Sequence, residues 1–140
     1  MATEPLLISC SKQISCQVFA YLDGFEKTNS ALNARAIDFA RFGLLILNQG
    51  RWNGQQIISR HWVTESTTPD PAWHQAGGSY KYDWWGLNNP DGTYDYLAWG
   101  KQGQHMYVSP SPNTVVVRLG GGGPPDLWPF AICALIRSLA

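Results

Sequence analysis

Strand-forming residues fill most of the chain between residues 80 and 120, in four runs that only short turns separate. The runs are rich in Tyr, Trp and Val, and Asn, Gly, Ser and Pro lie between them; they read YKYDWWGL, TYDYLAWG, QHMYVSP and TVVVRLG. Aromatic and β-branched residues bounded by such turn residues are typical of strands. Parallel strands need long crossover connections, so strands joined this closely favour an antiparallel meander of about four strands.

Helical patterns lie on both sides of this region. Apolar residues recur at a helical spacing over residues 34–47, and the stretch from Asn29 to Asn33 can cap that helix. Ser59 is placed to cap a second short helix, which two prolines end. After a glycine-rich stretch, residues 127–140 predict an apolar closing helix with Asp126 as its cap. The order of helices, then strands, then one helix predicts an α+β fold.

Charge and composition exclude several classes of partner. The 140-residue chain is long enough for one hydrophobic core, and its ten basic and ten acidic residues cancel. We therefore expect no nucleic-acid partner. No run approaches the roughly 20 apolar residues of a membrane span, and the short apolar run before Cys10 lacks the basic region of a signal peptide. We expect no membrane association and a cytoplasmic location for the chain as written.

The cysteines give no sign of a disulfide framework or a metal site. There are three of them, an odd number, and neither a Cys-x-x-Cys pair nor a Cys/His pattern with zinc spacing occurs. We interpret them as free thiols, which favour a reducing compartment. We expect no metal and no other cofactor.

Aromatic residues are dense, with seven Trp and six Tyr, most of them between Trp52 and Trp99. Such rings can form a platform that stacks on the apolar faces of sugars. They can equally form the core and the wall of a cleft. The composition alone leaves both interpretations open.

One lysine lies in a region otherwise almost free of charge, in the sequence Lys101-Gln102-Gly103. A lysine at the mouth of a strand can attract a substrate carboxylate or favour the charged form of a nearby nucleophile. Gly103 would let a substrate approach the backbone, where a neighbouring N–H can face a developing oxyanion. A solvated edge lysine beside a bulge glycine explains the same three residues.

Longer segments around this lysine resemble a known family. GFEKTNSALNARAIDFARFGLLILNQGRWNGQQIISRHWV, YDWWG and AWGKQGQHMYVSPSPNTVVVRLG resemble the C-terminal half of the β-lactamase-related serine hydrolases. That family includes class C β-lactamases, D-alanyl-D-alanine carboxypeptidases, family VIII esterases and 6-aminohexanoate-dimer hydrolases. The resemblance covers about residues 22–120. It implies the C-terminal part of a β-lactamase/transpeptidase-like fold, with residues 21–140 as one incomplete domain and residues 1–20 unassigned.

The resemblance also implies roles for individual residues. In the family, an active-site strand carries a Lys-Thr-Gly box or a His-x-Gly variant, and here Lys101, Gln102 and Gly103 stand in the matching place. Lys101 would support the nucleophile electrostatically, and the backbone N–H of Gln104 would be an oxyanion donor. Gln102 stands where the family box has Thr, whose hydroxyl family members direct at a substrate carboxylate. This difference argues against classical β-lactam recognition. The substrate contacts would be Gln102, Trp99, Trp85 and Tyr82.

The other two catalytic boxes of the family are not convincingly present. A Ser-x-x-Lys string occurs once, with Ser9 as nucleophile and Lys12 as base, but it lies too close to Lys101 and is easily produced by chance. The one Ser-x-Asn string begins at Ser111, where turn chemistry explains it. The sequence thus predicts a truncated, catalytically impaired portion of a hydrolase whose intact relatives cleave a small-molecule ester or amide through an acyl-enzyme.

Two further expectations concern partners. The alternative function is a non-catalytic, aromatic-rich binding module for sugar or cell-wall fragments. The run TVVVRL would be a strand edge without a partner, because the family pairs it with an N-terminal strand that is missing here. An unpaired edge of this kind invites association with a second copy of the chain.

Overall fold

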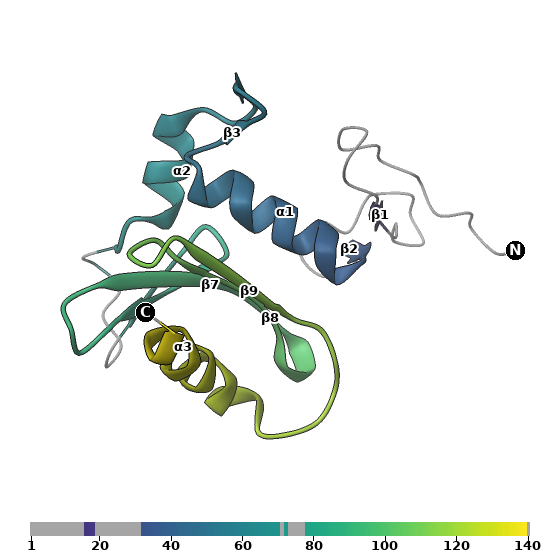
Figure 1. Ribbon diagram of the computed structural model, residues 1–140, viewed down its shortest axis with the longest axis vertical. Coiled ribbons are helices and arrows are strands. Elements are labelled where there is room, and N and C mark those ends of the chain that lie inside the picture. The colour runs from purple at the N-terminus through teal and green to yellow at the C-terminus, as the bar shows by residue number, and fades with distance from the viewer. Residues whose placement is uncertain (1–15, 19–31, 71, 73–77, 140) are drawn as a thin grey trace, which may run out of the picture.

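The computed structural model describes residues 16–18, 32–70, 72 and 78–139 (Figure 1). Three α-helices lie in this part of the chain: α1 (Ala36–Leu47), α2 (Arg60–Thr67) and α3 (Trp128–Leu139). Two short ladders precede the main sheet: β1 (Cys16–Val18) with β2 (Leu32–Ala34), and β3 (Arg51–Trp52) with β4 (Gln55–Gln56). The main sheet contains β5 (Gly78–Lys81), β6 (Trp84–Asn88), β7 (Tyr94–Gly100), β8 (Gln104–Ser109) and β9 (Thr114–Arg118).

The main sheet is an antiparallel meander in the order β5-β6-β7-β8-β9, so the predicted α+β class and meander are confirmed. It has five strands where the sequence indicated about four. The run YKYDWWGL divides into β5 and β6 at Tyr82 and Asp83, which have φ values of +48° and +66°. Left-handed backbone at both central residues is the geometry of a tight hairpin turn. A short turn follows Asn88 and leads into β7.

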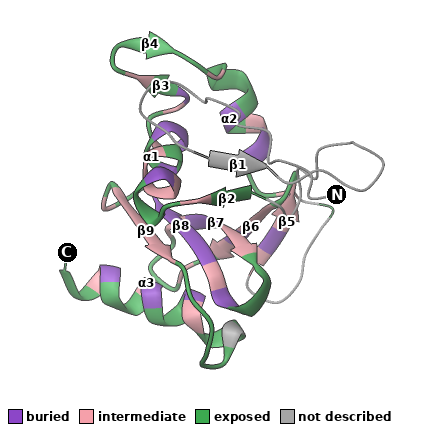
Figure 2. Cartoon of the chain, turned by 90° about the vertical axis from the view of Figure 1, so that its right-hand side faces the viewer, coloured by how far each residue is buried: buried purple, intermediate pink, exposed green. Residues whose placement is uncertain are grey.

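Helices cover both faces of this sheet (Figure 1): α1 and α2 lie on one side and α3 on the other. Neighbouring residues of a strand point to opposite faces, so each strand contributes to two cores. On the α1 and α2 side, one buried cluster contains Ile46, Val63, Tyr96 and Val108. On the α3 side, a second contains Leu97, Tyr107, Ile132 and Ile136. Figure 2 shows the buried residues concentrated in the central strands and on the inner sides of the helices.

The helix boundaries follow local signals in part. Ser59 caps α2 as predicted, since its Oγ accepts a hydrogen bond from the Trp62 N–H at 3.1 Å. The cap expected for α1 between Asn29 and Asn33 is wrong, because α1 starts at Ala36 behind Arg35, which makes no side-chain cap bond. None of the described helices is both long and apolar enough to cross a membrane.

The first helix lies close to the sheet because a glycine faces it. A methyl group at Gly43 of α1 would come within 2.6 Å of Val115 Cγ1 on β9. Asp38, on the same helix, is buried between two arginines: Arg35 Nε and Arg41 Nη1 each lie 2.8 Å from its carboxylate. The buried charge of Asp38 is thus balanced by two arginines, each three residues away along the chain.

Candidate functional site

The predicted catalytic lysine lies in a tight turn between two strands. Lys101, Gln102 and Gly103 form one turn of 3-10 helix that joins β7 to β8, with φ of +62° at Gln102 and +82° at Gly103. The three residues are therefore at the mouth of the two strands and not inside one. Lys101 and Gln102 are exposed to solvent, and Gly103 is buried.

An open hollow of about 340 Å³ lies beside this turn. Its lining brings together three residues that the sequence assigned to a site, Trp85, Trp99 and Lys101, and adds Gly100 and Asp126. Asp126 was expected only as a helix cap; it lies in the short 3-10 turn η2 (Pro125–Leu127) directly before α3. A carboxylate and an ammonium group thus border one aromatic-walled hollow. Nothing in the local sequence indicates that a residue 25 positions after Lys101 shares its pocket.

The aromatic wall is fixed by contacts between rings. The Trp85 and Trp99 rings meet edge to face with centroids 5.6 Å apart, and Trp85 also packs on Tyr80 at 4.7 Å. Behind Trp99 lies the imidazole of His105, which is buried and 5.4 Å away between ring centroids. Trp99 and His105 are directly opposite each other across the β7–β8 ladder. Each ring of the wall therefore packs against at least one other ring of the same chain.

Arg118, at the end of β9, holds the lysine turn in place. Its Nη1 donates to the carbonyls of Gly103 and Gly120, the latter at 2.8 Å, and its Nη2 donates to Gly122 O at 3.0 Å. Its guanidinium lies over the Trp128 ring, 4.0 Å from the centroid. Gly103 is needed beside it, because a Cβ there would lie 2.9 Å from Arg118 Nη1. One arginine thus ties the turn of Lys101 to the start of α3.

The side chain of Gln104 makes a structural contact with the backbone of Gly120. Its side-chain amide donates to Gly120 O at 3.1 Å and accepts from the Gly120 N–H at 2.9 Å. Gln104 is the first residue of β8 and lies opposite Gly100 in the ladder. The oxyanion role of its backbone N–H stays a prediction. Sequence reasoning missed both Arg118 and the Gln104 side chain, because their partners are backbone groups of a glycine loop that carries no pattern of its own.

The remaining predicted site residues do not join this pocket. Tyr82 lies in the β5–β6 turn, is 54% exposed, and packs against Trp62 of α2 with ring centroids 5.1 Å apart. Ser9 and Lys12 lie outside the described residues. Among the described residues that line the hollow there is no serine.

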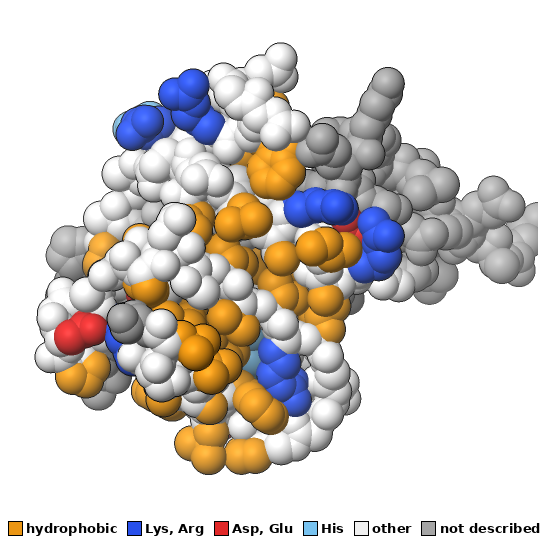
Figure 3. All heavy atoms as spheres, in the orientation of Figure 1, with side chains coloured by type: hydrophobic (Ala, Val, Ile, Leu, Met, Phe, Trp, Pro, Cys, Tyr) orange, Lys and Arg blue, Asp and Glu red, His pale blue; other side chains and the backbone are white. Residues whose placement is uncertain are grey.

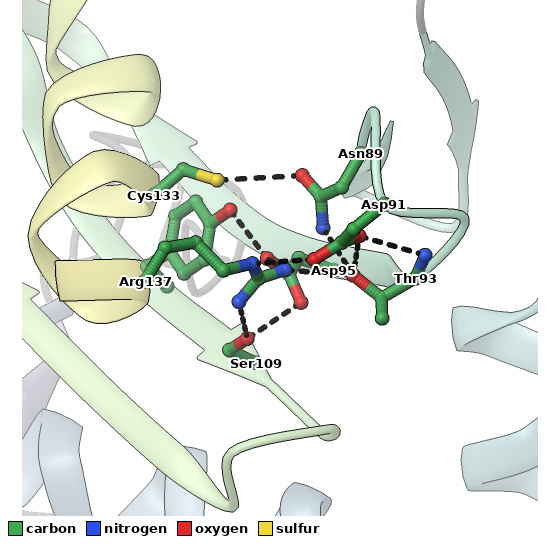
Figure 4. Close-up of polar contacts among 8 residues, drawn as sticks. Asn89, Asp91, Thr93, Asp95, Ser109, Cys133 and Arg137 are labelled. Atoms are coloured by element: carbon green, nitrogen blue, oxygen red, sulfur yellow. Dashed lines mark hydrogen bonds and ion pairs between the residues drawn. The ribbon is translucent and has the colours of Figure 1, made fainter. Parts of the chain in front are cut away.

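A second polar cluster lies at the opposite end of β7, under the C-terminal half of α3 (Figure 4). Asp95 has no exposed surface and accepts hydrogen bonds from Tyr107 Oη at 2.7 Å and Ser109 Oγ at 2.6 Å. Arg137 of α3 completes the cluster, 3.2 Å from Asp95 Oδ2 and 3.0 Å from Asp91 Oδ2. Burial, and then the bond to Asp95, raise the pKa of the Tyr107 hydroxyl well above its usual value.

This cluster contains a serine beside a carboxylate, but its geometry is structural. Ser109 has no exposed surface, and its Oγ also accepts a hydrogen bond from Arg137 Nη1 at 3.2 Å. A nucleophile must reach a substrate, and this hydroxyl cannot. Cys133, a free thiol on α3, lies 3.4 Å from Asn89 Oδ1 at the edge of the cluster. The cluster therefore fixes α3 against the sheet.

Comparisons with known proteins agree with this architecture. No family model matches the chain. It is 29% identical over 112 residues to a 6-aminohexanoate-dimer hydrolase from Paenarthrobacter ureafaciens, an alignment that covers 74% of this chain and 28% of that protein. A solved structure from Bacillus anthracis, assigned as a 6-aminohexanoate-dimer hydrolase, superposes with a TM-score of 0.75 and 25% identity over 89% of this chain and 34% of the other.

These similarities in sequence and fold support the predicted resemblance to a part of the β-lactamase-related serine hydrolases. Both of these proteins are described as 6-aminohexanoate-dimer hydrolases. The chain spans only about a third of their length or less.

Proposed function

We propose that this chain is a catalytically impaired C-terminal portion of a 6-aminohexanoate-dimer hydrolase, which retains a substrate-binding wall and lacks its nucleophile. The observation that carries this proposal is the hollow beside Lys101, whose described lining consists of two tryptophans, a glycine, a lysine and an aspartate, without a serine. The short coverage of the relatives supports the same conclusion.

The residues of the hollow suit a flexible chain with polar ends. The faces of Trp85 and Trp99 can pack against methylene groups, which gain most from leaving water. Lys101 can attract a carboxylate, and Asp126 can attract an ammonium group. Gln104 would offer its backbone N–H to the oxygen of a carbonyl group at the mouth of β8. An acyl-enzyme still requires a serine hydroxyl within hydrogen-bond reach of a base, so binding without turnover is the expected outcome.

Fluorophosphonate labelling of the full chain tests the missing nucleophile. We expect no adduct by mass spectrometry on a chain whose circular dichroism shows it to be folded. Ser9→Ala is the matched variant, since Ser9 heads the one Ser-x-x-Lys string. An adduct on Ser9 that the variant abolishes would show a working nucleophile and refute the impairment.

Binding is tested separately by tryptophan fluorescence. Titration with the linear dimer of 6-aminohexanoate should perturb the emission of the native chain, and Trp99→Ala should remove most of that change because Trp99 lines the hollow. Trp62→Ala is the control, since Trp62 lies on α2 beside Tyr82. An equal response in both variants would place the ligand elsewhere.

A binding module for sugar or cell-wall fragments is the second candidate. The specific observation in its favour is the exposed pair of Trp62 and Tyr82, which are 48% and 54% exposed with rings in contact. Exposed ring faces of this kind can stack on pyranose rings. Here the expectations reverse: Trp62→Ala, and not Trp99→Ala, would abolish the fluorescence response to a cell-wall oligosaccharide.

A further inference from the structure

Arg118 contacts the peptide group that contains the predicted oxyanion donor. Its Nη1 donates a hydrogen bond to the Gly103 carbonyl, which belongs to the same peptide unit as the backbone N–H of Gln104. Its other hydrogen bonds go to the carbonyls of Gly120 and Gly122, and among the described residues no carboxylate forms a salt bridge with it. The positive charge of the guanidinium therefore acts directly on the carbonyl end of this peptide.

The direction of the Gln104 N–H follows from this contact. In a trans peptide the C=O and N–H bonds point in opposite directions, and the described part of the chain contains no cis peptide. Because the Gly103 carbonyl faces the guanidinium of Arg118, the N–H of Gln104 points away from it. β8 lies between β7 and β9, and Arg118 is the last residue of β9. On the side away from β9, the ladder partner of Gln104 is Gly100, which lines the hollow.

Contacts on several sides fix the guanidinium and the peptide relative to each other. The ring of Trp128 lies against the guanidinium of Arg118, 4.0 Å away at its centroid. The Gln104 side chain makes two hydrogen bonds to the backbone of Gly120, one of the carbonyl residues that Arg118 also contacts. Figure 3 shows basic side chains, with hydrophobic ones beside them, where the β7–β8 turn lies in Figure 1. A donor held in this way is preorganised and needs no rearrangement when a ligand binds.

We propose that Arg118 is a positioning residue, which orients and polarises the Gly103–Gln104 peptide so that the Gln104 N–H becomes a stronger donor to the carbonyl of a bound amide. The inference rests on the proposed function, in which this N–H faces a ligand carbonyl. Hydrogen bonds in a chain polarise and strengthen one another, and a bond from a charged donor is roughly twice as strong as a neutral one. Arg118 thus acts on the ligand through the peptide and does not touch it.

NMR spectra of the ligand-free chain test the polarisation directly. Arg118→Met keeps an unbranched stem over Trp128 and removes the charged donors, so the amide proton and nitrogen resonances of Gln104 should move upfield. Arg118→Lys restores the charge on a single nitrogen, and its Gln104 resonances should lie between those of the other two chains. Ile136→Val is the control, because it loosens the packing of α3 without changing any contact of this peptide.

Unchanged Gln104 resonances in Arg118→Met would overturn the inference, and so would an equal movement in Ile136→Val. Circular dichroism shows whether each variant is folded. If Arg118→Met does not fold, Arg118→Lys decides the question against the native chain, and the absence of any upfield movement there would overturn the inference.

A pair of ligands tests the consequence for binding. The linear dimer of 6-aminohexanoate has an amide carbonyl at its centre, and the saturated ω-amino acid of the same length has the same charged ends without that carbonyl. Calorimetric titration gives the ratio of the two affinities for each chain. Arg118→Met should lower the preference for the dimer roughly fivefold, and Ile136→Val should leave it unchanged. A general loosening of the hollow would weaken both ligands alike, so a merely structural role of Arg118 does not move this ratio.

The outcomes separate this inference from the proposed function. Binding of both ligands with an unchanged ratio in Arg118→Met would overturn the role of Arg118 and leave the retained binding wall intact. If the native chain binds neither ligand, the binding wall is refuted, and the Gln104 resonances alone decide whether Arg118 polarises the peptide.

Discussion

Replacing Tyr107 by Phe removes a single oxygen atom from the cluster that holds α3 against the sheet. The Tyr107 hydroxyl donates to Asp95 Oδ2 at 2.7 Å, and neither side chain has exposed surface. Water therefore cannot replace the lost donor. The acceptor is the carboxylate that pairs with Arg137, and a hydrogen bond to a charged group contributes about 1.5–3 kcal/mol to stability. We expect Tyr107→Phe to lower the free energy of unfolding by about 2 kcal/mol.

Tyr96 provides a matched control in the same sheet. It is 4% exposed and packs edge to face on Trp84, on the α1 and α2 side. Among the described residues, its hydroxyl makes no hydrogen bond to another side chain. Tyr96→Phe therefore deletes the same atom without deleting a bond, and its cost should stay below about 0.5 kcal/mol.

Urea unfolding followed by circular dichroism measures both variants, with the slope against denaturant compared to confirm that only stability changed. In an Asp95→Asn background the cost of Tyr107→Phe should shrink, because the charged acceptor is already gone. A Tyr107→Phe loss no larger than that of Tyr96→Phe would refute the view that the Asp95 contact stabilises the fold.

Three further outcomes follow from the structure. Gly103→Ala should lower the free energy of unfolding by about 2 kcal/mol, because φ is +82° there and a Cβ would lie 2.9 Å from Arg118 Nη1. Gly92→Ala, where φ is +80° but the space is open, should lower it by about 1 kcal/mol. Equal losses in urea unfolding would refute the effect of the contact with Arg118. Hydrogen bonds from Thr93 hold the pKa of Asp91 below its usual range. The contribution of Asp91 to stability is therefore present above about pH 4 and is lost as the pH falls through the folded-state pKa. Asp91→Asn should reduce the fall of the melting temperature on the acid side of a pH series. Burial raises the pKa of Tyr96 to about 12. The contribution of the neutral Tyr96 hydroxyl to stability is therefore complete below about pH 10 and is lost as the pH rises toward 12. Tyr96→Phe should reduce the tyrosinate absorbance that appears only when the chain unfolds in alkali.

Local signals were enough to predict the elements that depend on neighbours in sequence. Alternating aromatic and β-branched residues predicted the meander, and Ser59 predicted the start of α2. Asn53 and Gly54 form the turn between β3 and β4, and an Asn-Gly pair signals such a turn locally because both residues adopt left-handed backbone readily. The turn at Tyr82 was not, since an aromatic residue with positive φ has no characteristic sequence signal.

The pocket was predictable only where its residues share the β6 to β7 hairpin. Trp85 and Trp99 lie on one face of adjacent strands, and Lys101 follows Trp99 by two positions, so strand periodicity brings them together. Asp126 reaches the hollow at the end of a glycine loop whose backbone carbonyls accept hydrogen bonds from Arg118. Interactions of that kind leave no periodic pattern, and only the folded chain reveals them.

The pocket and the buried cluster depend on each other through α3. At its first residue, Trp128 lies under the Arg118 guanidinium that also holds the lysine turn, and near its last residues Arg137 pairs with Asp95. These two attachments are nine residues apart, which is roughly 13–14 Å along the helix axis. Asp126 directly precedes this helix, so its position at the pocket is set by the same two attachments. A polar network outside the hollow thus helps to set the position of the Asp126 carboxylate relative to Lys101.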